Sequence, residues 1–284
     1  MASGARATGE AMDPVSKKDG ERLQLLRRIE EALNAAACAI SPFLVGAPKT
    51  EFKSGRDPVT EADRTANRIL RDALLQDGEG WLSEESVDDL SRLEKERLWV
   101  VDPIDGTREF ISGIPEWCIS VGFVENGRTV AGGICNPATG EVFLGTLGGG
   151  VRRNGTSVSI SQRQSLEGAV VLASRSEIAR GEWDCFRDAP FVTRPMGSVA
   201  YKLALVASGL ADATWTGCPK HEWDIAAGSV LVEAAGGLVR SLNGSKLRFN
   251  SPLPRLPGLV ACGPQLDLEL SSWLRGRTDH SILR

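Results

Sequence analysis

Apolar residues recur with helical spacing in two segments near the start of the chain. In residues 23–38 they form one stripe, made of Leu23, Leu26, Ile29, Leu33 and Ala36. This spacing predicts a helix with a single buried face. A second helix is expected to begin at Thr60, because Asp63 follows three residues later and the pair resembles a capping box. Its apolar face consists of Ala62, Ala66, Ile69, Leu70, Ala73 and Leu74.

Short apolar and alternating segments follow, and these predict strands. Residues 81–83 and 97–101 are strand candidates, and residues 118–146 have the alternation of a β-meander. Asn126 and Gly127 form a hairpin signal inside that meander. We therefore expect the first half of the chain to be helices packed on a largely antiparallel sheet.

The second half alternates strands with helices, which is typical of an α/β arrangement. The predicted strands are 169–173, 211–215, 238–241 and 258–261, and the predicted helices are 199–208, 223–235 and 266–274. The fold class is thus a mixture of α+β and α/β. We expect an N-terminal α+β subdomain at residues 22–160 and a C-terminal α/β subdomain at 161–284. Residues 1–21, rich in Ala, Gly and charge, are expected to be a disordered tail.

Composition narrows the class of protein. The chain has 284 residues, of which 42% are apolar and 25% charged, as in ordinary globular proteins. A net charge of −4 gives no reason to expect binding to a nucleic acid polymer or a membrane. No apolar run suits a membrane span or a signal peptide, so we expect a cytoplasmic protein. The six cysteines are scattered without a C-x-x-C pair, and we expect them to be reduced and mostly buried.

Candidate chemistry is concentrated in residues 99–107, with the sequence WVVDPIDGT. The proline between Asp102 and Asp105 predicts that the strand stops and turns there, which can aim both carboxylates at one point. Carboxylates without histidine or cysteine suit Mg²⁺. The backbone N–H groups of Gly106 and Thr107 suit a phosphate. The alternative is a strand followed by an ordinary Asp-Gly turn.

Two further carboxylates stand at the ends of predicted elements. Glu84 follows a short strand, and Asp224 opens a helix. Taken alone, Glu84 could be a solvated surface charge, and Asp224 could simply favour the first helical turn. Taken with Asp102 and Asp105, they predict carboxylates converging on one cleft, because ends of sheet elements can share an edge.

Asp63 and Thr107 form a candidate pair for activating water. A threonine hydroxyl that donates to a carboxylate keeps lone pairs able to accept a proton from water. The pair would then act as a general base in which the hydroxyl is the working end.

At this point the motifs resemble those of the inositol monophosphatase superfamily of Mg²⁺-dependent, lithium-sensitive phosphomonoesterases. The matching segments are 57–63 (DPVTEAD), 82–86 (LSEES), 99–107 (WVVDPIDGT), 222–228 (EWDIAAG) and 234–237 (AAGG). The resemblance spans about residues 22–276. It implies a layered α-β-α-β-α sandwich of the inositol monophosphatase and fructose-1,6-bisphosphatase type.

The resemblance also implies a set of metal ligands. Glu84, Asp102 and the backbone carbonyl of Ile104 would hold a first Mg²⁺. Asp102, Asp105 and Asp224 would hold a second. Two or three Mg²⁺ ions and inhibition by Li⁺ are therefore expected.

The remaining roles implied by the resemblance concern water and phosphate. Thr107 and Asp63 would activate the attacking water, and the N–H groups of Gly106 and Thr107 would hold phosphate oxygens. The partner would be a small phosphorylated substrate. The chain would be a monomer or a homodimer.

The substrate depends on weaker signals. The segments 82–85 (LSEE), 105–110 (DGTREF) and 173–176 (ASRS) resemble the 3′(2′),5′-bisphosphate nucleotidase branch. There, Ser174, Arg175 and Lys202 would contact the substrate, Lys202 by pairing with a second phosphate. Each basic residue could instead be solvated. We predict hydrolysis of the 3′-phosphate of 3′-phosphoadenosine 5′-phosphate.

Three alternatives stay open on the sequence alone. One is a phosphatase for inositol 1-phosphate or a related sugar alcohol, because residues 220–224 (KHEWD) also occur in general members and a single tyrosine leaves few aromatics for adenine. Another is a histidinol phosphate phosphatase. The last, of a different class, is a non-catalytic relative that binds metal or anions.

Overall fold

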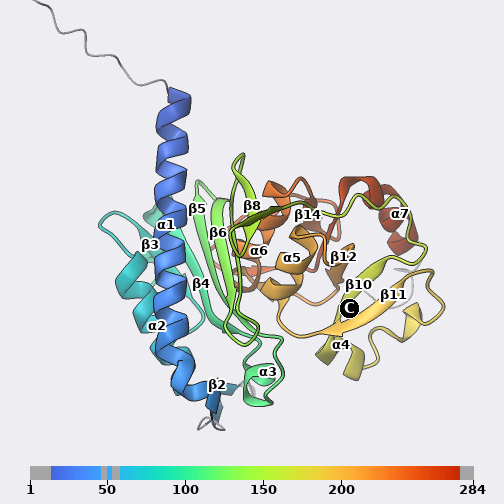
Figure 1. The fold of residues 1–284 in the computed structure, drawn as a ribbon, viewed down its shortest axis with the longest axis horizontal. Coiled ribbons are helices and arrows are strands. Elements are labelled where there is room, and N and C mark those ends of the chain that lie inside the picture. The colour runs from blue at the N-terminus through green and yellow to red at the C-terminus, as the bar shows by residue number, and fades with distance from the viewer. Residues whose placement is uncertain (1–13, 46–49, 53–57, 276–284) are drawn as a thin grey trace, which may run out of the picture.

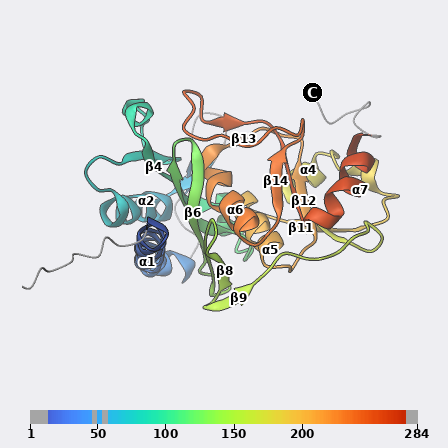
Figure 2. The same cartoon turned by 90° about the horizontal axis from the view of Figure 1, so that it is seen from above.

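The computed structural model describes residues 14–45, 50–52 and 58–275. Helices and sheets alternate across the molecule in five layers, which Figures 1 and 2 show from two directions. Three clusters of buried apolar side chains fill the spaces between the layers. The expected α-β-α-β-α sandwich is confirmed.

The first layer is the long helix α1 (Pro14–Ile40) with α2 (Glu61–Leu74) beside it. The helix therefore begins well before the predicted start at residue 23 and includes residues 14–21 of the predicted tail; proline suits a first helical turn. Residues 1–13 lie outside the described residues. Leu23, expected on the buried stripe, is 53% exposed, and Leu25 is buried in its place because the contact face is rotated.

Short elements connect these two helices. They are the 3₁₀ turn η1 (Ser41–Val45) and the paired strands β1 (Thr50–Phe52) and β2 (Pro58–Thr60). The predicted capping box is confirmed: Thr60 Oγ1 accepts from the N–H of Asp63, and Asp63 accepts from the N–H of Thr60.

The second layer is a seven-stranded sheet in the order β3-β4-β5-β6-β7-β8-β9. Its strands are β3 (Gly80–Ser83), β4 (Arg97–Asp105), β5 (Cys118–Glu125), β6 (Arg128–Asn136), β7 (Glu141–Thr146), β8 (Gly150–Arg153) and β9 (Thr156–Val158). Only the β3–β4 pair is parallel, which agrees with the predicted meander. Asn126 and Gly127 make the predicted hairpin turn, both with positive φ.

Strand β4 does not stop at Asp102 as the proline predicted. It continues to Asp105, where pairing with β5 resumes at Cys118 after an irregularity that begins at Asp102. A bulge of this kind accommodates a proline without ending the strand. The 3₁₀ turn η2 (Ser91–Glu94) precedes β4, and the short helix α3 (Thr107–Ile111) follows it.

The fourth layer is a mixed five-stranded sheet in the order β11-β10-β12-β16-β14. Its strands are β10 (Val170–Ser174), β11 (Val192–Met196), β12 (Ala213–Thr216), β14 (Leu238–Ser241) and β16 (Leu259–Cys262). Around it lie α4 (Arg175–Ala179), η3 (Asp184–Phe186), the pair β13 (Lys220–His221) and β15 (Arg255–Leu256), and the outer helix α7 (Pro264–Arg275). Strand β11 was not predicted, because its sequence, VTRPM, lacks the alternation of apolar and polar residues. The strand is correspondingly little buried.

The middle layer consists of α5 (Val199–Ala207) and α6 (Glu222–Ala234), which lie between the two sheets in Figure 1. Helix α6 packs so closely on β5 and β6 that only glycine fits beneath it. A Cβ atom at Gly122 would lie 2.8 Å from Cβ of Ala226, and one at Gly132 would lie 2.6 Å from Cγ1 of Val230. This close packing fixes the N-terminus of α6, with Asp224, relative to β4.

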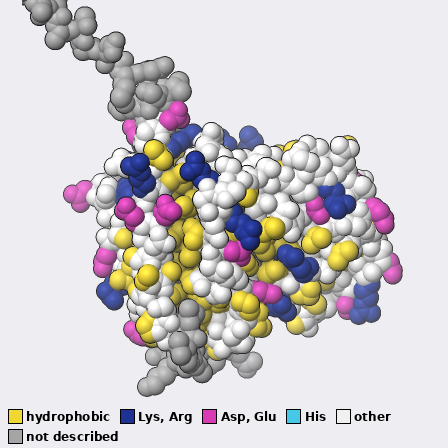
Figure 3. Space-filling view, viewed as in Figure 1, with side chains coloured by type: hydrophobic (Ala, Val, Ile, Leu, Met, Phe, Trp, Pro, Cys, Tyr) yellow, Lys and Arg dark blue, Asp and Glu magenta, His cyan; other side chains and the backbone are white. Residues whose placement is uncertain are grey.

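On the face seen in Figure 3, acidic and basic side chains are interspersed rather than gathered by sign. No helix among the described residues is long and apolar enough to cross a membrane.

The prediction that the cysteines are mostly buried holds for three of the six. Cys118, Cys135 and Cys262 are buried.

Candidate metal centre

Three of the predicted ligands converge at one point. Asp102, Asp105 and Asp224 each place a possible ligand atom within 4.8 Å of the others. The first two come from the irregular end of β4, and the third from the first turn of α6. Glu84, just after β3, is not part of this tight group, but it lies near enough for its charge to act on Asp102 and Asp224.

Each of the three carboxylates is held by a backbone N–H group. Asp102 accepts from Ile104 at 3.1 Å, Asp105 from Ala200 at 2.6 Å and Asp224 from His221 at 3.0 Å. The last contact belongs to a capping arrangement, so one side chain both starts α6 and reaches the cluster.

The electrostatics of the cluster favour bound cations. Burial raises the pKa of the Asp102 carboxyl well above its usual range, and the nearby carboxylates of Glu84 and Asp105 raise it further. Burial likewise raises the pKa of Asp224, as does the charge of Asp105. Buried like charges are costly unless a cation neutralises them. An all-oxygen donor set of this kind fits Mg²⁺, and these residues could hold it.

The predicted pair of Asp63 and Thr107 is also brought together. Thr107 Oγ1 lies 3.3 Å from Asp63 Oδ1 and 3.1 Å from the carbonyl oxygen of Ile104. Asp63 is 2% exposed and is fixed by Thr60, whose N–H and hydroxyl donate at 2.7 and 2.5 Å. The hydroxyl of Thr107 thus stands between a buried carboxylate and the end of β4.

Gly106 makes the turn from β4 into α3. Its φ of +96° is a conformation that glycine adopts readily, and a Cβ atom there would lie 3.1 Å from the carbonyl oxygen of Glu116. The N–H groups of Gly106 and Thr107 come at the start of α3, where helical N–H groups have no partner within the helix. The predicted phosphate donors therefore adjoin the carboxylate cluster.

The predicted substrate residues behave differently from one another. Lys202 on α5 is 4% exposed, and among the described residues its ammonium group makes no hydrogen bond or ion pair. Burial, with the charge of Lys220, lowers the pKa of Lys202 to about 8, although Asp105 and Glu177 oppose the shift. It is therefore a buried residue within electrostatic reach of Asp105, not a solvated helix residue.

Arg175 and Ser174 are engaged with protein groups. The Arg175 guanidinium makes a two-pronged ion pair with Glu116, at 2.5 and 2.6 Å. Ser174 caps the short helix α4, accepting from the N–H of Glu177. Nε and Nη2 of Arg175 are therefore engaged by Glu116 and the Ser174 hydroxyl by α4, and the predicted contacts of both residues with substrate remain predictions.

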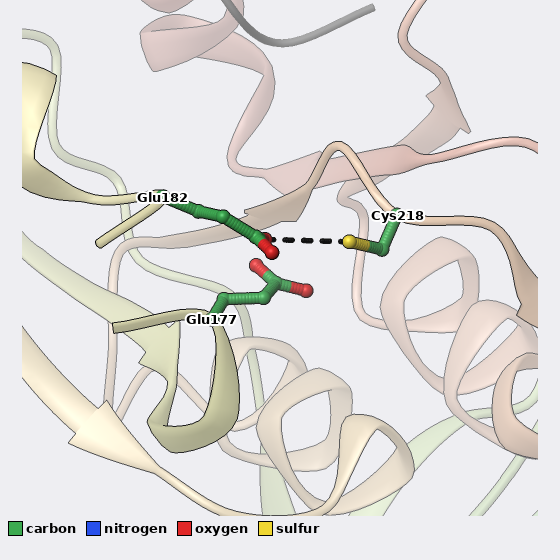
Figure 4. Close-up of side chains that lie close together, drawn as sticks. All are labelled: Glu177, Glu182 and Cys218. Carbon is green, nitrogen blue, oxygen red and sulfur yellow. Dashed lines mark hydrogen bonds between the residues drawn. The ribbon is translucent and has the colours of Figure 1, made fainter. Parts of the chain in front are cut away.

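A second group of possible ligand atoms, which the sequence did not single out, lies beyond Lys220. Figure 4 shows Glu177, Glu182 and Cys218 together, beside a cavity of about 360 Å³. Glu177 pairs with Lys220 at 3.3 Å, and Glu182 with Arg180 at 2.6 Å. These ion pairs already neutralise much of the negative charge of this cluster.

Comparison with known proteins gives a consistent result. Residues 24–270 match the model of the inositol monophosphatase family. An inositol-1-monophosphatase of Rhizobium meliloti is 32% identical over 224 residues, covering 76% of this chain and 81% of that protein. A fructose-1,6-bisphosphatase/inositol-1-monophosphatase of Thermotoga maritima is 37% identical, covering 70% and 75%. The solved IMPase structure from Thermotoga maritima superposes with a TM-score of 0.78 at 27% identity, covering 92% and 98%.

Proposed function

The chain belongs to the inositol monophosphatase family and is a Mg²⁺-dependent phosphomonoester hydrolase, and within that class we propose that it removes the phosphate of inositol 1-phosphate or a related sugar-alcohol phosphate. The observation that carries the proposed site is the convergence of Asp102, Asp105 and Asp224 beside the Thr107–Asp63 pair. Membership of an enzyme family removes the alternative of a non-catalytic relative.

We assign the residues of the site as follows. Asp102, Asp105 and Asp224 would hold Mg²⁺, and Glu84 and the carbonyl of Ile104 would complete the ligands. When bound, Mg²⁺ neutralises the phosphate and promotes ionisation of water. The N–H groups of Gly106 and Thr107 orient the phosphate oxygens.

Proton removal falls to Thr107 and Asp63. The Thr107 hydroxyl donates its hydrogen toward Asp63 and accepts the proton of the attacking water, so that Asp63 is the final acceptor. Asp63 is buried and has no cationic partner among the described residues that would hold it ionised at low pH.

We expect kcat to depend on the ionisation of Asp63. Burial raises the pKa of this carboxyl from its usual value to about 6, despite hydrogen bonds from Thr60 that lower it. Below that pH the carboxyl keeps its proton and cannot accept another. At saturating Mg²⁺, kcat should therefore rise about tenfold per pH unit in the acidic limb and level off near or below pH 6, since bound cations lower the pKa.

The control for this profile is a neighbouring acid that is exposed. Glu61 lies in the same turn of α2, with 63% of its side chain exposed. Glu61→Gln should keep the profile, whereas Asp63→Asn should lose most of the activity at every pH. A flat wild-type profile between pH 4.5 and 7 would contradict the assignment of Asp63 as the acceptor.

The choice of substrate differs from the prediction made on sequence signals. Two relatives support a sugar or sugar-alcohol phosphate over a bisphosphate nucleotide: an inositol-1-monophosphatase at 32% identity and a fructose-1,6-bisphosphatase/inositol-1-monophosphatase at 37%. The engagement of Arg175 by Glu116 also weakens the case for the nucleotide, because that guanidinium was expected to contact substrate.

One observation favours a second candidate, 3′-phosphoadenosine 5′-phosphate. The buried ammonium of Lys202, without an ion-pair partner among the described residues, could bind a second anionic group of the substrate. A monophosphate of a neutral polyol offers no such group.

A phosphate-release panel distinguishes the candidates. It compares inositol 1-phosphate, 3′-phosphoadenosine 5′-phosphate, fructose 1,6-bisphosphate and histidinol phosphate, each with Mg²⁺ and with or without Li⁺. We expect the highest kcat/KM for inositol 1-phosphate. Lys202→Met should then leave its KM within about threefold, and the exposed Lys246→Met serves as the matched control. A preference for the nucleotide that Lys202→Met abolishes would favour the second candidate.

A further inference from the structure

Ser198, which precedes α5, has a backbone conformation that side chains of L-residues rarely adopt. Its φ is +47° and its ψ is 127°, outside the left-handed helical region where Leu90 lies with φ 64° and ψ 1°. Glycine reaches this conformation at much lower cost. Backbone strain of this kind persists only where neighbouring contacts impose it, and it is common at functional sites.

The hydroxyl of Ser198 is placed on a residue of the metal centre. Ser198 Oγ donates to Asp105 Oδ2 at 2.7 Å, and the N–H of Ala200 donates to the same oxygen at 2.6 Å. The same hydroxyl also accepts from the N–H of Tyr201 at 2.9 Å, which caps α5. Because a carboxylate is planar, two donors on Oδ2 also fix the position of Oδ1.

The preceding residue is held as firmly. The N–H of Gly197 donates to Glu116 at 2.8 Å, and the ion pair with Arg175 fixes the Glu116 carboxylate from the other side. A Cβ atom at Gly197 would lie 2.5 Å from Cγ of Glu109 and 2.6 Å from the carbonyl oxygen of Glu116. Gly197 and Ser198, which form the turn into α5, are therefore both held in place by contacts with other parts of the chain.

We propose that Ser198 is a positioning residue of the metal centre, retained in a strained conformation because its hydroxyl orients the Asp105 carboxylate toward the cation. The hydrogen bond from Ser198 to Asp105 connects the two sheets. Asp105 ends strand β4 of the first sheet, and Ser198 lies between β11 of the second sheet and α5. The inference rests on the assignment of Asp105 as a metal ligand under the proposed function.

Ser198→Gly separates this role from a structural one. The change removes the hydroxyl and relieves the strain, and loss of a serine cap to glycine is mild. We expect the metal-free variant to melt no lower than wild type, while calorimetry shows Mg²⁺ binding weakened about tenfold, the lower limit for lost outer hydrogen bonds to metal ligands. The Mg²⁺ concentration giving half-maximal activity should rise in parallel.

Two further variants complete the test. Ser198→Thr keeps the hydroxyl but adds a branched Cβ, so it should bind Mg²⁺ within about threefold of wild type while melting lower. Asn126→Gly is the matched control, because Asn126 also has positive φ but lies in the β5–β6 turn. It should leave Mg²⁺ binding unchanged.

The outcomes that overturn the proposal are distinct from failure of the proposed function. If Ser198→Gly binds Mg²⁺ as wild type does while Asp105→Asn binds it weakly, the ligand assignment stands and the positioning role is wrong. If Asp105→Asn itself binds Mg²⁺ normally, the assignment of the metal centre fails, and this inference fails with it.

Discussion

Asp102→Asn is expected to lower kcat by on the order of 1000-fold or more at saturating substrate, because even outer hydrogen-bond partners of metal ligands are worth about 10- to 100-fold. Asp102 is 1% exposed and lies within 4.8 Å of both Asp105 and Asp224. As the ligand assigned to both cations, it is the residue whose loss affects the most interactions. Initial rates of inositol 1-phosphate hydrolysis at 1 to 50 times the wild-type Mg²⁺ requirement measure the effect.

The variant should be folded, because it removes one of several buried carboxylates that raise one another's pKa. The metal-free variant is therefore expected to melt at or above the wild-type temperature. Asp184→Asn is the matched control, since the Asp184 side chain is 63% exposed and lies in η3, outside the carboxylate cluster. Activity of Asp102→Asn within tenfold of wild type would mean that the carboxylate cluster is not the catalytic centre.

Thr107→Ala is expected to lower kcat by about 100- to 1000-fold while changing KM by less than about threefold, as befits a group that acts in proton transfer. The hydroxyl that links Asp63 to the end of β4 is lost, but the N–H groups assigned to phosphate remain. Thr107→Ser keeps the hydroxyl and should retain most of the activity. Steady-state kinetics on both variants at fixed Mg²⁺ measure the difference.

The opposite pattern would assign Thr107 a different role. A raised KM with unchanged kcat in Thr107→Ala indicates that the hydroxyl binds substrate equally in ground and transition states. Equal losses in the alanine and serine variants would indicate that the branched side chain matters for packing at the start of α3 rather than for its hydroxyl.

The sequence predicted those parts of the site that depend on local chemistry. The Thr60–Asp63 capping box and the first turn of α6 are each encoded within a few residues and were found as expected, whereas β4 continues past its predicted end at residue 101. Asp102 and Asp105 could be recognised as a pair because they lie close together in the sequence, whereas Glu84 and Asp224 were grouped with them because each stands at the end of an element. The layered fold followed from periodicity and from the family resemblance.

Other features depend on residues far apart in sequence, and no local pattern reports them. The pairing of Arg175 with Glu116 joins residues 59 positions apart, and Ser198 meets Asp105 across 93 positions. The burial of Lys202 depends on packing of α5 between two sheets. The prediction that the proline at 103 ends the strand was wrong for a related reason, because pairing with the distant strand β5 continues beyond it.

The backbone contacts of the acidic residues have a consequence for the thermodynamics of metal binding. Asp63, Asp102, Asp105 and Asp224 each accept a main-chain hydrogen bond, so their rotamers are already selected in the folded chain. Immobilising a side chain costs about 0.5–1.5 kcal/mol, and here that entropy is lost on folding instead of on association. The carboxylates are therefore preorganised before the cation binds. The free energy of binding then depends mainly on the cost of dehydrating the cation and on the gain from relieving the repulsion between the carboxylates.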